Sequence, residues 1–177
     1  MPRPAAIPSN VTLKPYRGTD NGNGTTTIHD VEIVGPMPAG HRPDAVRESP
    51  ELGAKWMDAV LATHTAQLVG GYVAPVHSGH HGSTDDVPSL GSFVPLYRRK
   101  ATYEGESLDV LFGDMTVDNG TFAAILRGEY PHRSIEVERW GNHVITSLAL
   151  LPPSQPPFWR FPMLKNVIVE NEPAPTA

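Results

Sequence analysis

The chain has 177 residues, of which 16 are glycine and 19 are proline, and its formal net charge is −5. Glycine and proline together make up about a fifth of the chain, which excludes a coiled coil or a helical bundle and predicts extensive loops. The lack of cysteine excludes disulfides, thiol nucleophiles and thiolate zinc sites. The negative charge argues against a specific nucleic-acid binder, and no apolar run approaches the roughly 20 residues of a membrane helix. We therefore expect neither nucleic acid nor membrane among the partners.

The first 24 residues are rich in proline and end in a run of asparagine and glycine, which predicts a flexible arm. No apolar signal core follows the N-terminus, so export is not expected. Side-chain periodicity and turn residues then predict the following elements: strand 25–34, helix 49–69, strand 72–76, a hairpin of strands 92–102 and 107–117, helix 118–127, and strands 133–140 and 143–151.

Capping residues mark the limits of both predicted helices. Ser49-Pro50 is typical of a helix start, and Gly70-Gly71 ends the first helix. Asp118 is placed to cap the second helix, and Gly128 to close it. The elements together predict an α+β domain over residues 25–165, a small, mostly antiparallel β-barrel with two or more helices, followed by a tail over residues 166–177.

A polar loop over residues 77–91 carries three histidines within five positions, His77, His80 and His81, with Asp85-Asp86 close behind. Histidine and carboxylate side chains ligate zinc, but this spacing matches no established helical zinc pair, so we expect no metal and no cofactor. The stronger interpretation is that one imidazole is a general base, for which its ordinary pKa near ~6.5 suits it. A solvated polar loop is the alternative.

Ser134 enters a predicted strand directly after the turn at Tyr130-Pro131, where it could be a positioned nucleophile. Because side chains alternate along a strand, Ser134, Glu136 and Glu138 are expected on one face.

Three stretches of the chain resemble motifs that occur together in one known family. Residues 74–80 read Ala-Pro-Val-His-Ser-Gly-His and are similar to the family's Ala-Pro-x-x-x-Gly-His. Residues 128–136, Gly-x-Tyr-x-x-Arg-Ser-x-Glu, look like its Gly-x-Tyr-x-x-Arg-Ser-x-x-Phe signature, with Arg133 and Ser134 at the Arg-Ser positions. Residues 148–151, followed by Pro156-Pro157, resemble its Val-Ala-Leu-Leu-Gly…Pro-Pro ending. Together the three stretches resemble phage prohead (capsid maturation) proteases of the Mu type, and the resemblance covers about residues 25–165.

This resemblance implies a serine endopeptidase with a herpesvirus-assemblin-like barrel, which cleaves scaffold and major capsid proteins, and itself, during head maturation. Such an enzyme acts in the host cytoplasm inside the immature capsid, and a homo-oligomer is compatible with it. Carried onto this chain, Ser134 is the nucleophile and His80 its general base, with His77 as the alternative base. The alternative function is a catalytically weak or inactive scaffold- or capsid-associated protein with the same fold.

The family places an orienting histidine or acid on its last strand, and the corresponding residue here is Ser147. A four-residue hairpin loop would pair Ser134 with Ser147, whereas a two-residue loop would pair Ser134 with Ala149 and leave Ser147 as its diagonal neighbour. Thr146 and His143 remain alternatives for the third catalytic residue.

Overall fold

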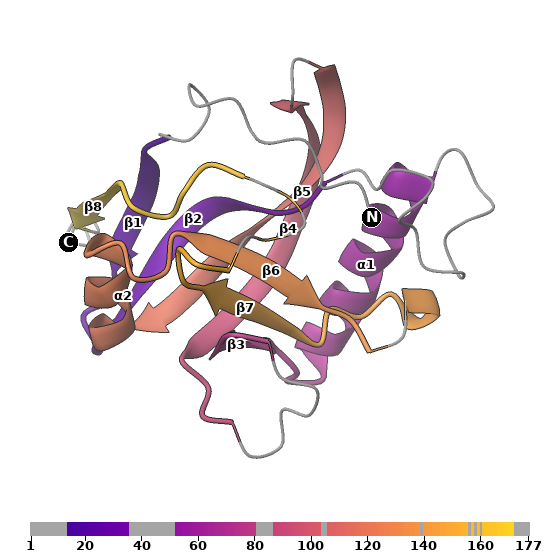
Figure 1. Cartoon of the computed structure of the whole chain (residues 1–177). Helices are drawn as coiled ribbons and strands as arrows, with labels where there is room; N and C mark the ends of the chain where they lie inside the picture. Colours follow the sequence, from indigo (N-terminus) through magenta and orange to yellow (C-terminus); the bar gives the residue numbers. More distant parts are fainter. Residues whose placement is uncertain are drawn as a thin grey trace, which may run out of the picture.

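A computed structural model describes residues 14–35, 52–80, 87–103, 106–138, 140–155, 157, 159 and 161–171, which contain eight strands and two α-helices. The elements in chain order are β1 Tyr16–Asp20, β2 Thr25–Val34, α1 Leu52–Val69, β3 Ala74–Ser78, β4 Gly91–Tyr103, β5 Glu106–Asp118, α2 Asn119–Leu126, β6 His132–Glu136, the 3-10 turn η4 Trp140–Asn142, β7 Ser147–Leu151 and β8 Val167–Asn171 (Figure 1). No helix in these ranges is long and apolar enough to cross a membrane.

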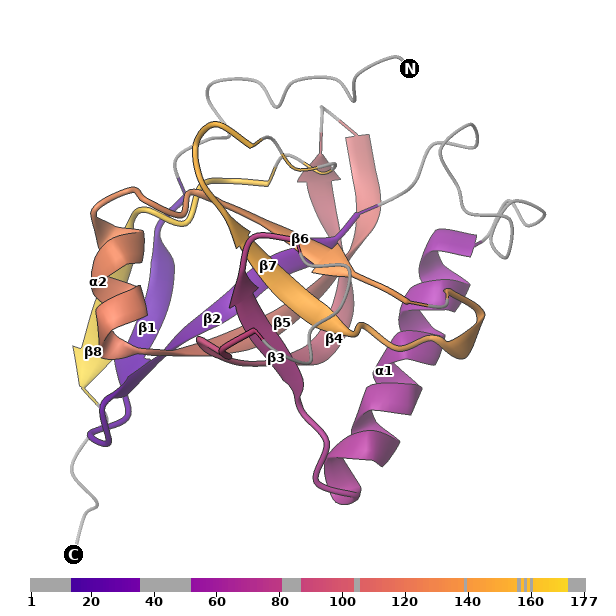
Figure 2. The ribbon, with the colours of Figure 1, turned by 60° about the horizontal axis from the view of Figure 1, so that its bottom comes forward.

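The strands form one mixed sheet in the order β6-β7-β3-β4-β5-β2-β1-β8. The pairs β1–β8 and β3–β7 are parallel, and the other neighbours are antiparallel. Among the described residues β6 and β8 remain the two edges of the sheet, so the predicted α+β class is confirmed and closure into a barrel is not. Figures 1 and 2 show how strongly the long strands β2, β4 and β5 curve.

The sheet extends beyond both limits of the predicted domain, residues 25–165. Strand β1 lies within the segment expected to be a flexible arm, and β8 lies within the expected tail. The two strands pair in parallel, from Tyr16↔Val167 to Asp20↔Asn171. Each strand is therefore stabilised by a partner about 150 residues away in the chain, and local sequence patterns carry no signal for such a partner.

The predicted central hairpin is confirmed, because β4 and β5 pair as far as Tyr103↔Glu106. Its turn, Glu104-Gly105, lies outside the described residues. Helix α2 is capped as predicted: the Asp118 carboxylate accepts a hydrogen bond from the Thr121 N–H at 2.8 Å. The same contact lowers the pKa of Asp118.

Helix α1 ends at Val69, directly before the predicted stop at Gly70-Gly71. Its predicted start at Ser49-Pro50 lies outside the described residues.

The last two strands are shorter than the predicted ranges 133–140 and 143–151. Strand β6 ends at Glu136 and β7 begins only at Ser147. Between them the chain forms η4, followed by His143, which has a positive φ of 56°. This left-handed residue, together with η4, breaks the regular extended backbone and interrupts the hairpin that the sequence pattern predicted.

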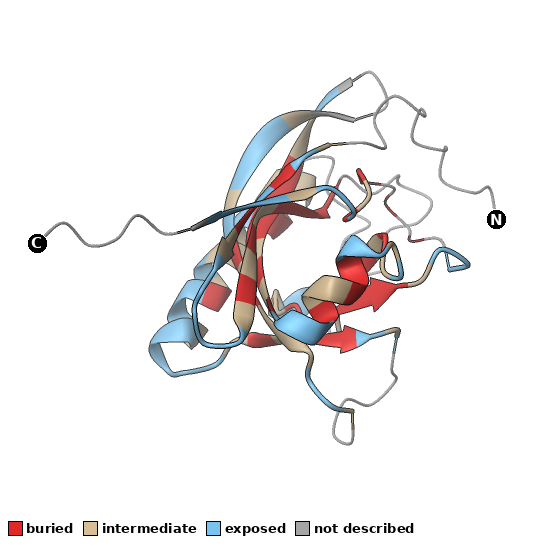
Figure 3. Cartoon of the chain, turned by 90° about the vertical axis from the view of Figure 1, so that its left-hand side faces the viewer, coloured by how far each residue is buried: buried red, intermediate tan, exposed pale blue. Residues whose placement is uncertain are grey.

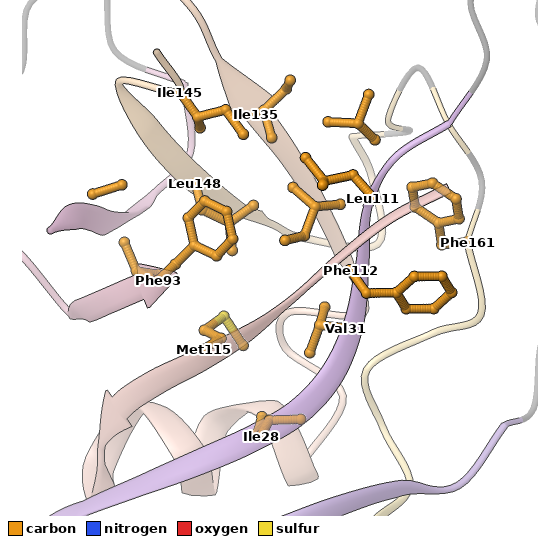
Figure 4. Packing of buried hydrophobic residues seen from close by; sticks show 14 of the residues in the cluster. Ile28, Val31, Phe93, Leu111, Phe112, Met115, Ile135, Ile145, Leu148 and Phe161 are labelled. Carbon is orange, nitrogen blue, oxygen red and sulfur yellow. The ribbon is translucent and has the colours of Figure 1, made fainter. Parts of the chain in front are cut away.

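The core fills the inside of the curved sheet, where aromatic and aliphatic side chains from distant strands interdigitate (Figure 4). The largest fully buried side chains are Tyr16, Ile28, Ile33, Met57, Phe93, Leu111, Phe112, Met115, Ile125, Ile145, Leu148 and Leu150. Figure 3 shows the buried residues concentrated in the strands at the centre of the molecule.

A buried arginine joins β6 to β2 across this core. Arg133 is only 3% exposed, and its Nε donates to the Glu32 carbonyl at 3.0 Å. Its Nη2 donates to the Tyr16 hydroxyl at 3.1 Å and lies 3.5 Å from Glu32 Oε2. Nη1 donates to the Pro162 carbonyl. Although four strands separate β6 from β2 in the sheet order, its curvature brings them together around this guanidinium group.

The groups around Arg133 complete the network. The Glu32 carboxylate accepts from Lys14 Nζ at 2.8 Å, and Tyr16 OH lies 3.2 Å from Glu32 Oε2. Burial raises the pKa of the Tyr16 hydroxyl, so Tyr16 keeps its proton and remains a donor. All three nitrogens of the buried guanidinium thus find an acceptor when β6 presents Arg133 inward.

Replacing Arg133 with alanine is expected to lower the free energy of unfolding by about 3–5 kcal/mol, because the buried Glu32 carboxylate loses one of its two countercharges and keeps only the partly exposed Lys14. Urea denaturation followed by circular dichroism measures the change. The exposed Arg17 on β1 provides the control, and Arg17→Ala is expected to change stability by less than about 0.5 kcal/mol. Equal effects of the two substitutions would contradict a structural role for the buried network.

Helix α1 is attached to the segment before β7 by a buried histidine. His64 Nε2 accepts a hydrogen bond from the Ile145 N–H at 2.9 Å, which requires the neutral imidazole. Burial lowers the pKa of His64 below its ordinary value. The unfolded chain therefore binds a proton at His64 at a higher pH than the folded chain does.

Stability is accordingly expected to fall as the pH drops below about 6.5, with His64 contributing at most about 1.4 kcal/mol per pH unit. His64→Gln keeps an acceptor for the Ile145 N–H but removes the titration. Urea unfolding of both proteins between pH 5 and pH 8 isolates this contribution as a difference in slope. Identical slopes would show that His64 does not couple protonation to folding.

Candidate functional site

Strand β6 presents alternate side chains to opposite sides. Arg133 and Ile135 are buried, whereas His132, Ser134 and Glu136 lie on the other face and are partly exposed. The pairing with β7 places Ser134 opposite Ala149 and Glu136 opposite Ser147. The register that would pair Ser134 with Ser147 is therefore wrong. The alternative register is observed, with Ser147 as the diagonal neighbour of Ser134.

The histidine loop leaves β3 through a glycine in the left-handed region. Gly79 has a φ of 77°, and its N–H donates to the Leu150 carbonyl at 2.9 Å. This conformation costs a residue with a side chain far more than it costs glycine, and it turns the chain sharply after β3. His80 follows directly, and its ring reaches the face of β6 that carries Ser134 and Glu136.

Glu136 holds the His80 imidazole. His80 Nδ1 lies 3.0 Å from Glu136 Oε1, and because a carboxylate can only accept, Nδ1 carries the proton. The Glu136 side chain is only 16% exposed, compared with 41% for His80. Within the described ranges His80 makes no other side-chain hydrogen bond, which leaves the Nε2 lone pair available to accept a proton.

Ser147 supports the same carboxylate from β7. Its hydroxyl donates to Glu136 Oε2 at 3.2 Å and is completely buried. Both oxygens of Glu136 are thus occupied, one by the imidazole and one by the serine. Ser147 therefore orients the carboxylate rather than the imidazole.

The two motif segments are joined at a second point. The Ser78 hydroxyl at the end of β3 lies 3.0 Å from the Tyr130 hydroxyl, which precedes β6. Together with the contact between His80 and Glu136, this bond brings residues 74–80 and 128–136 into one region, although the bonded residues are 52 and 56 positions apart in the chain.

Ser134 lies beside this cluster without a hydrogen bond of its own to His80 among the described residues. It shares a strand face with Glu136, and two residues along a strand span about 6.6 Å. Catalytic hydrogen bonds are often long before a substrate binds, so this spacing is compatible with a nucleophile and its base. A separation of less than about 5 Å between the Ser134 hydroxyl and the His80 ring stays a prediction.

His77 occupies a different position from His80. It is buried in β3, and its Nδ1 lies 3.3 Å from the Pro88 carbonyl. In the sheet His77 pairs with Ala149, which in turn pairs with Ser134, so two strand spacings, about 9.6 Å, separate His77 from Ser134. The geometry favours His80 over His77 as the base.

The two other candidates for the third catalytic residue lie outside the cluster. The Thr146 N–H donates to the Glu136 carbonyl at 2.8 Å, and its Oγ1 accepts from the Glu138 N–H at 3.0 Å. His143 lies in the turn after η4, four residues before β7 begins. Thr146 thus fixes the end of β6, and among the described residues neither Thr146 nor His143 makes a hydrogen bond to His80.

Glu136, which contacts the His80 imidazole, is the candidate site residue that the sequence motifs did not identify. The alternation of side chains along the predicted strand placed Glu136 on the same face as Ser134. This was the signal in the sequence that could have identified Glu136. The missing information was the path of the chain after Gly79, because that turn decides which side chain His80 meets.

The described residues contain no group of three or more histidine, aspartate and glutamate side chains that could hold a metal ion. His81 and Asp85-Asp86, the other members of the loop cluster, lie outside those residues.

A second series of hydrogen bonds between a hydroxyl, an imidazole and a carboxylate links strands β1, β2 and β5. Thr19 Oγ1 is 2.8 Å from His29 Nε2, and His29 Nδ1 is 3.0 Å from Asp114 Oδ2. Asp114 also accepts from the N–H of Asp30, which sits at a bulge in β2 with a φ of 55°. Both ring nitrogens of His29 are engaged in hydrogen bonds, so this series of bonds stabilises the bulge and offers no free base.

Comparisons with protein-family models, with curated proteins and with solved structures each return no match to this chain.

The contact between Glu136 and His80 makes a prediction about the imidazole. In Glu136→Gln, neutral His80 is expected to lose its preference for the Nδ1–H tautomer, because the glutamine amide can donate to Nδ1 as well as accept from it. Long-range ¹H–¹⁵N NMR spectra of the histidine rings report the tautomer directly. Glu138→Gln, two residues further along and without a bond to His80, is the matched control. An unchanged tautomer in Glu136→Gln would contradict the orienting role.

Proposed function

We propose that this chain is a serine endopeptidase of the phage prohead type, in which Ser134 is the nucleophile, His80 the general base and Glu136 the residue that orients the base. The observation that carries the proposal is the 3.0 Å contact between His80 Nδ1 and Glu136 Oε1, on the strand face that also presents Ser134. A carboxylate at Nδ1 fixes the tautomer in which Nε2 takes a proton from a serine.

The proposed reaction is acyl transfer in two steps. Ser134 Oγ attacks the carbonyl carbon of the scissile peptide bond while its proton passes to His80 Nε2. His80 then gives this proton to the leaving amine, the C–N bond breaks, and an acyl ester remains on Ser134. In the second step His80 deprotonates a water molecule, which hydrolyses the ester and restores the Ser134 hydroxyl.

The proposed substrates are scaffold and major capsid proteins, on the basis of the motif resemblance of residues 74–80 and 128–136. The same resemblance is the basis for proposing a herpesvirus-assemblin-like barrel. The curvature that brings β6 within reach of β2 supports it, and closure of the barrel would require the edges β6 and β8 to meet. In that family the orienting residue lies on the last strand, whereas here the acid lies two residues after the nucleophile.

An inactive scaffold- or capsid-associated protein is the second candidate. The observation that favours it is that Ser134 makes no hydrogen bond to His80 among the described residues. Activity measurements separate the two functions.

The test is co-expression with scaffold and capsid proteins of the same phage, followed by gel electrophoresis. Cleavage is expected with the wild-type chain and is expected to be lost in Ser134→Ala and His80→Ala. Glu136→Gln is expected to slow cleavage on the order of 10⁴-fold, as loss of an orienting carboxylate does in other triads. Ser147→Ala removes one neutral hydrogen bond and is expected to cost less than about tenfold.

Labelling of Ser134 by a fluorophosphonate, read as a mass shift of the intact chain, tests the nucleophile without any substrate protein. Cleavage that persists in Ser134→Ala would overturn the assignment of the nucleophile. No cleavage and no labelling of the wild-type chain would favour the inactive protein.

A further inference from the structure

The turn between β1 and β2 reads Asp20-Asn21-Gly22-Asn23-Gly24, in which asparagine is twice followed by glycine. A third such pair, Asn119-Gly120, begins α2. An asparagine before glycine can lose its side-chain amide, because the glycine backbone nitrogen attacks the side-chain carbonyl carbon and no Cβ hinders its approach. All three pairs are exposed, so exposure does not distinguish them. Their hydrogen bonds do.

The Asn21–Gly22 pair is restrained at both reacting groups. The Gly22 N–H donates to Asp20 Oδ1 at 2.9 Å. This nitrogen must lose its proton before it attacks, and the adjacent carboxylate opposes the formation of a second negative charge. The Asn21 amide is also held, because its Nδ2 donates to the hydroxyls of Thr25 and Thr27, both at 3.0 Å.

The Asn119–Gly120 pair has the same protection at its nitrogen. Asp118, the N-cap of α2, also accepts a hydrogen bond from the Gly120 N–H. The Thr26 hydroxyl donates to Asn119 Oδ1 at 2.9 Å and fixes the side chain. In both protected pairs, therefore, the aspartate directly before the asparagine places a carboxylate on the N–H of the glycine.

The Asn23–Gly24 pair lacks this protection. The Gly24 N–H makes no hydrogen bond within the part of the chain that the structure describes. No atom outside the adjacent residues lies within 4 Å of the position that a Cβ on Gly24 would take. Asn23 Oδ1 accepts from the Thr25 N–H at 3.2 Å and from the Thr25 hydroxyl at 2.6 Å. These two donors stabilise the negative charge that develops on Oδ1 when the carbonyl carbon is attacked.

We propose that Asn23 is a site of non-enzymatic deamidation, activated by Thr25, and that Asp20 and Asp118 protect the two other asparagines. The Gly24 nitrogen gives its proton to a solvent base and bonds to Asn23 Cγ. The Cγ–Nδ2 bond then breaks, and ammonia leaves with a proton from water. Water opens the resulting cyclic imide at either carbonyl carbon, which gives aspartate or isoaspartate. The reaction needs only water and is independent of the proposed endopeptidase activity.

Both products change the connection between the turn and α2, which lie beside each other in Figures 1 and 2. Each product adds a negative charge at position 23, and isoaspartate also lengthens the backbone directly before Gly24. The Gly24 carbonyl accepts a hydrogen bond from the Asn119 N–H at 2.9 Å. The modification therefore adjoins a contact that joins the hairpin to the helix.

The test follows each asparagine in the full 177-residue chain, incubated in mildly alkaline water enriched in ¹⁸O and analysed by peptide mass spectrometry. Asn23 is expected to incorporate ¹⁸O at least about tenfold faster than Asn21 or Asn119, the effect of one unit in the acidity of the attacking nitrogen. In urea, which removes the contacts, the three rates are expected to converge. Equal rates in the folded chain, or the same ranking in urea, would overturn the proposal.

Two substitutions of exposed aspartates form a matched pair. Asp20→Ser keeps an oxygen acceptor near the Gly22 N–H but removes the charge, and it is expected to accelerate deamidation of Asn21 about fivefold. Asp58→Ser, in α1, is expected to leave every rate unchanged. An unchanged rate at Asn21 in Asp20→Ser would overturn the protective role of the carboxylate.

Thr25→Val tests the activation, because it removes the hydroxyl and keeps the backbone N–H. The rate at Asn23 is expected to fall about fivefold, which is the scale of one neutral hydrogen bond. A rate that stays the same or rises would overturn the role of Thr25. The Ser134→Ala chain is expected to deamidate as fast as the wild-type chain, whether or not the wild-type chain cleaves head proteins. A slower rate in Ser134→Ala would overturn the non-enzymatic route.

Discussion

The orientation of β6 depends on one buried charge. Arg133 extends into the core, where the Glu32 carboxylate and carbonyl, the Tyr16 hydroxyl and the Pro162 carbonyl take up its donors. Because strand side chains alternate, an inward Arg133 requires an outward Ser134. A slip of one residue would bury Ser134 and leave the guanidinium without partners. Burial of an ion pair adds little net stability, so we interpret this network chiefly as a determinant of register.

The geometry of the candidate site depends on that register. With β6 fixed, Glu136 lies opposite Ser147 and meets His80, which Gly79 turns toward it. The cluster thus combines a carboxylate from an edge strand, an imidazole from a loop and a hydroxyl from an interior strand. The contrast with His29, whose two ring nitrogens are both occupied, shows why a free Nε2 on His80 matters for chemistry.

Features with local signals were predictable from the sequence, and features decided by remote partners were not. The cap at Asp118 and the stop after Val69 follow from neighbouring residues, and both are confirmed. Strands β1 and β8 depend on each other across most of the chain. The site divides in the same way: alternation placed Glu136 beside Ser134, but only the left-handed turn at Gly79 determines that His80 reaches Glu136.

The position of β6 at the edge of the sheet has a consequence for motion. An edge strand of five residues, bonded to one neighbour, opens at a lower free-energy cost than an interior strand such as β7, which is bonded on both sides. Ser134 and Glu136 therefore lie in a part of the sheet where local opening is expected to cost less free energy than opening of the interior strands. Arg133 limits this fluctuation, since every opening of β6 must extract or expose a charged group. The strand that carries the proposed nucleophile is thus an edge strand, which opens more easily than an interior strand, and it is also anchored to the core by the buried Arg133.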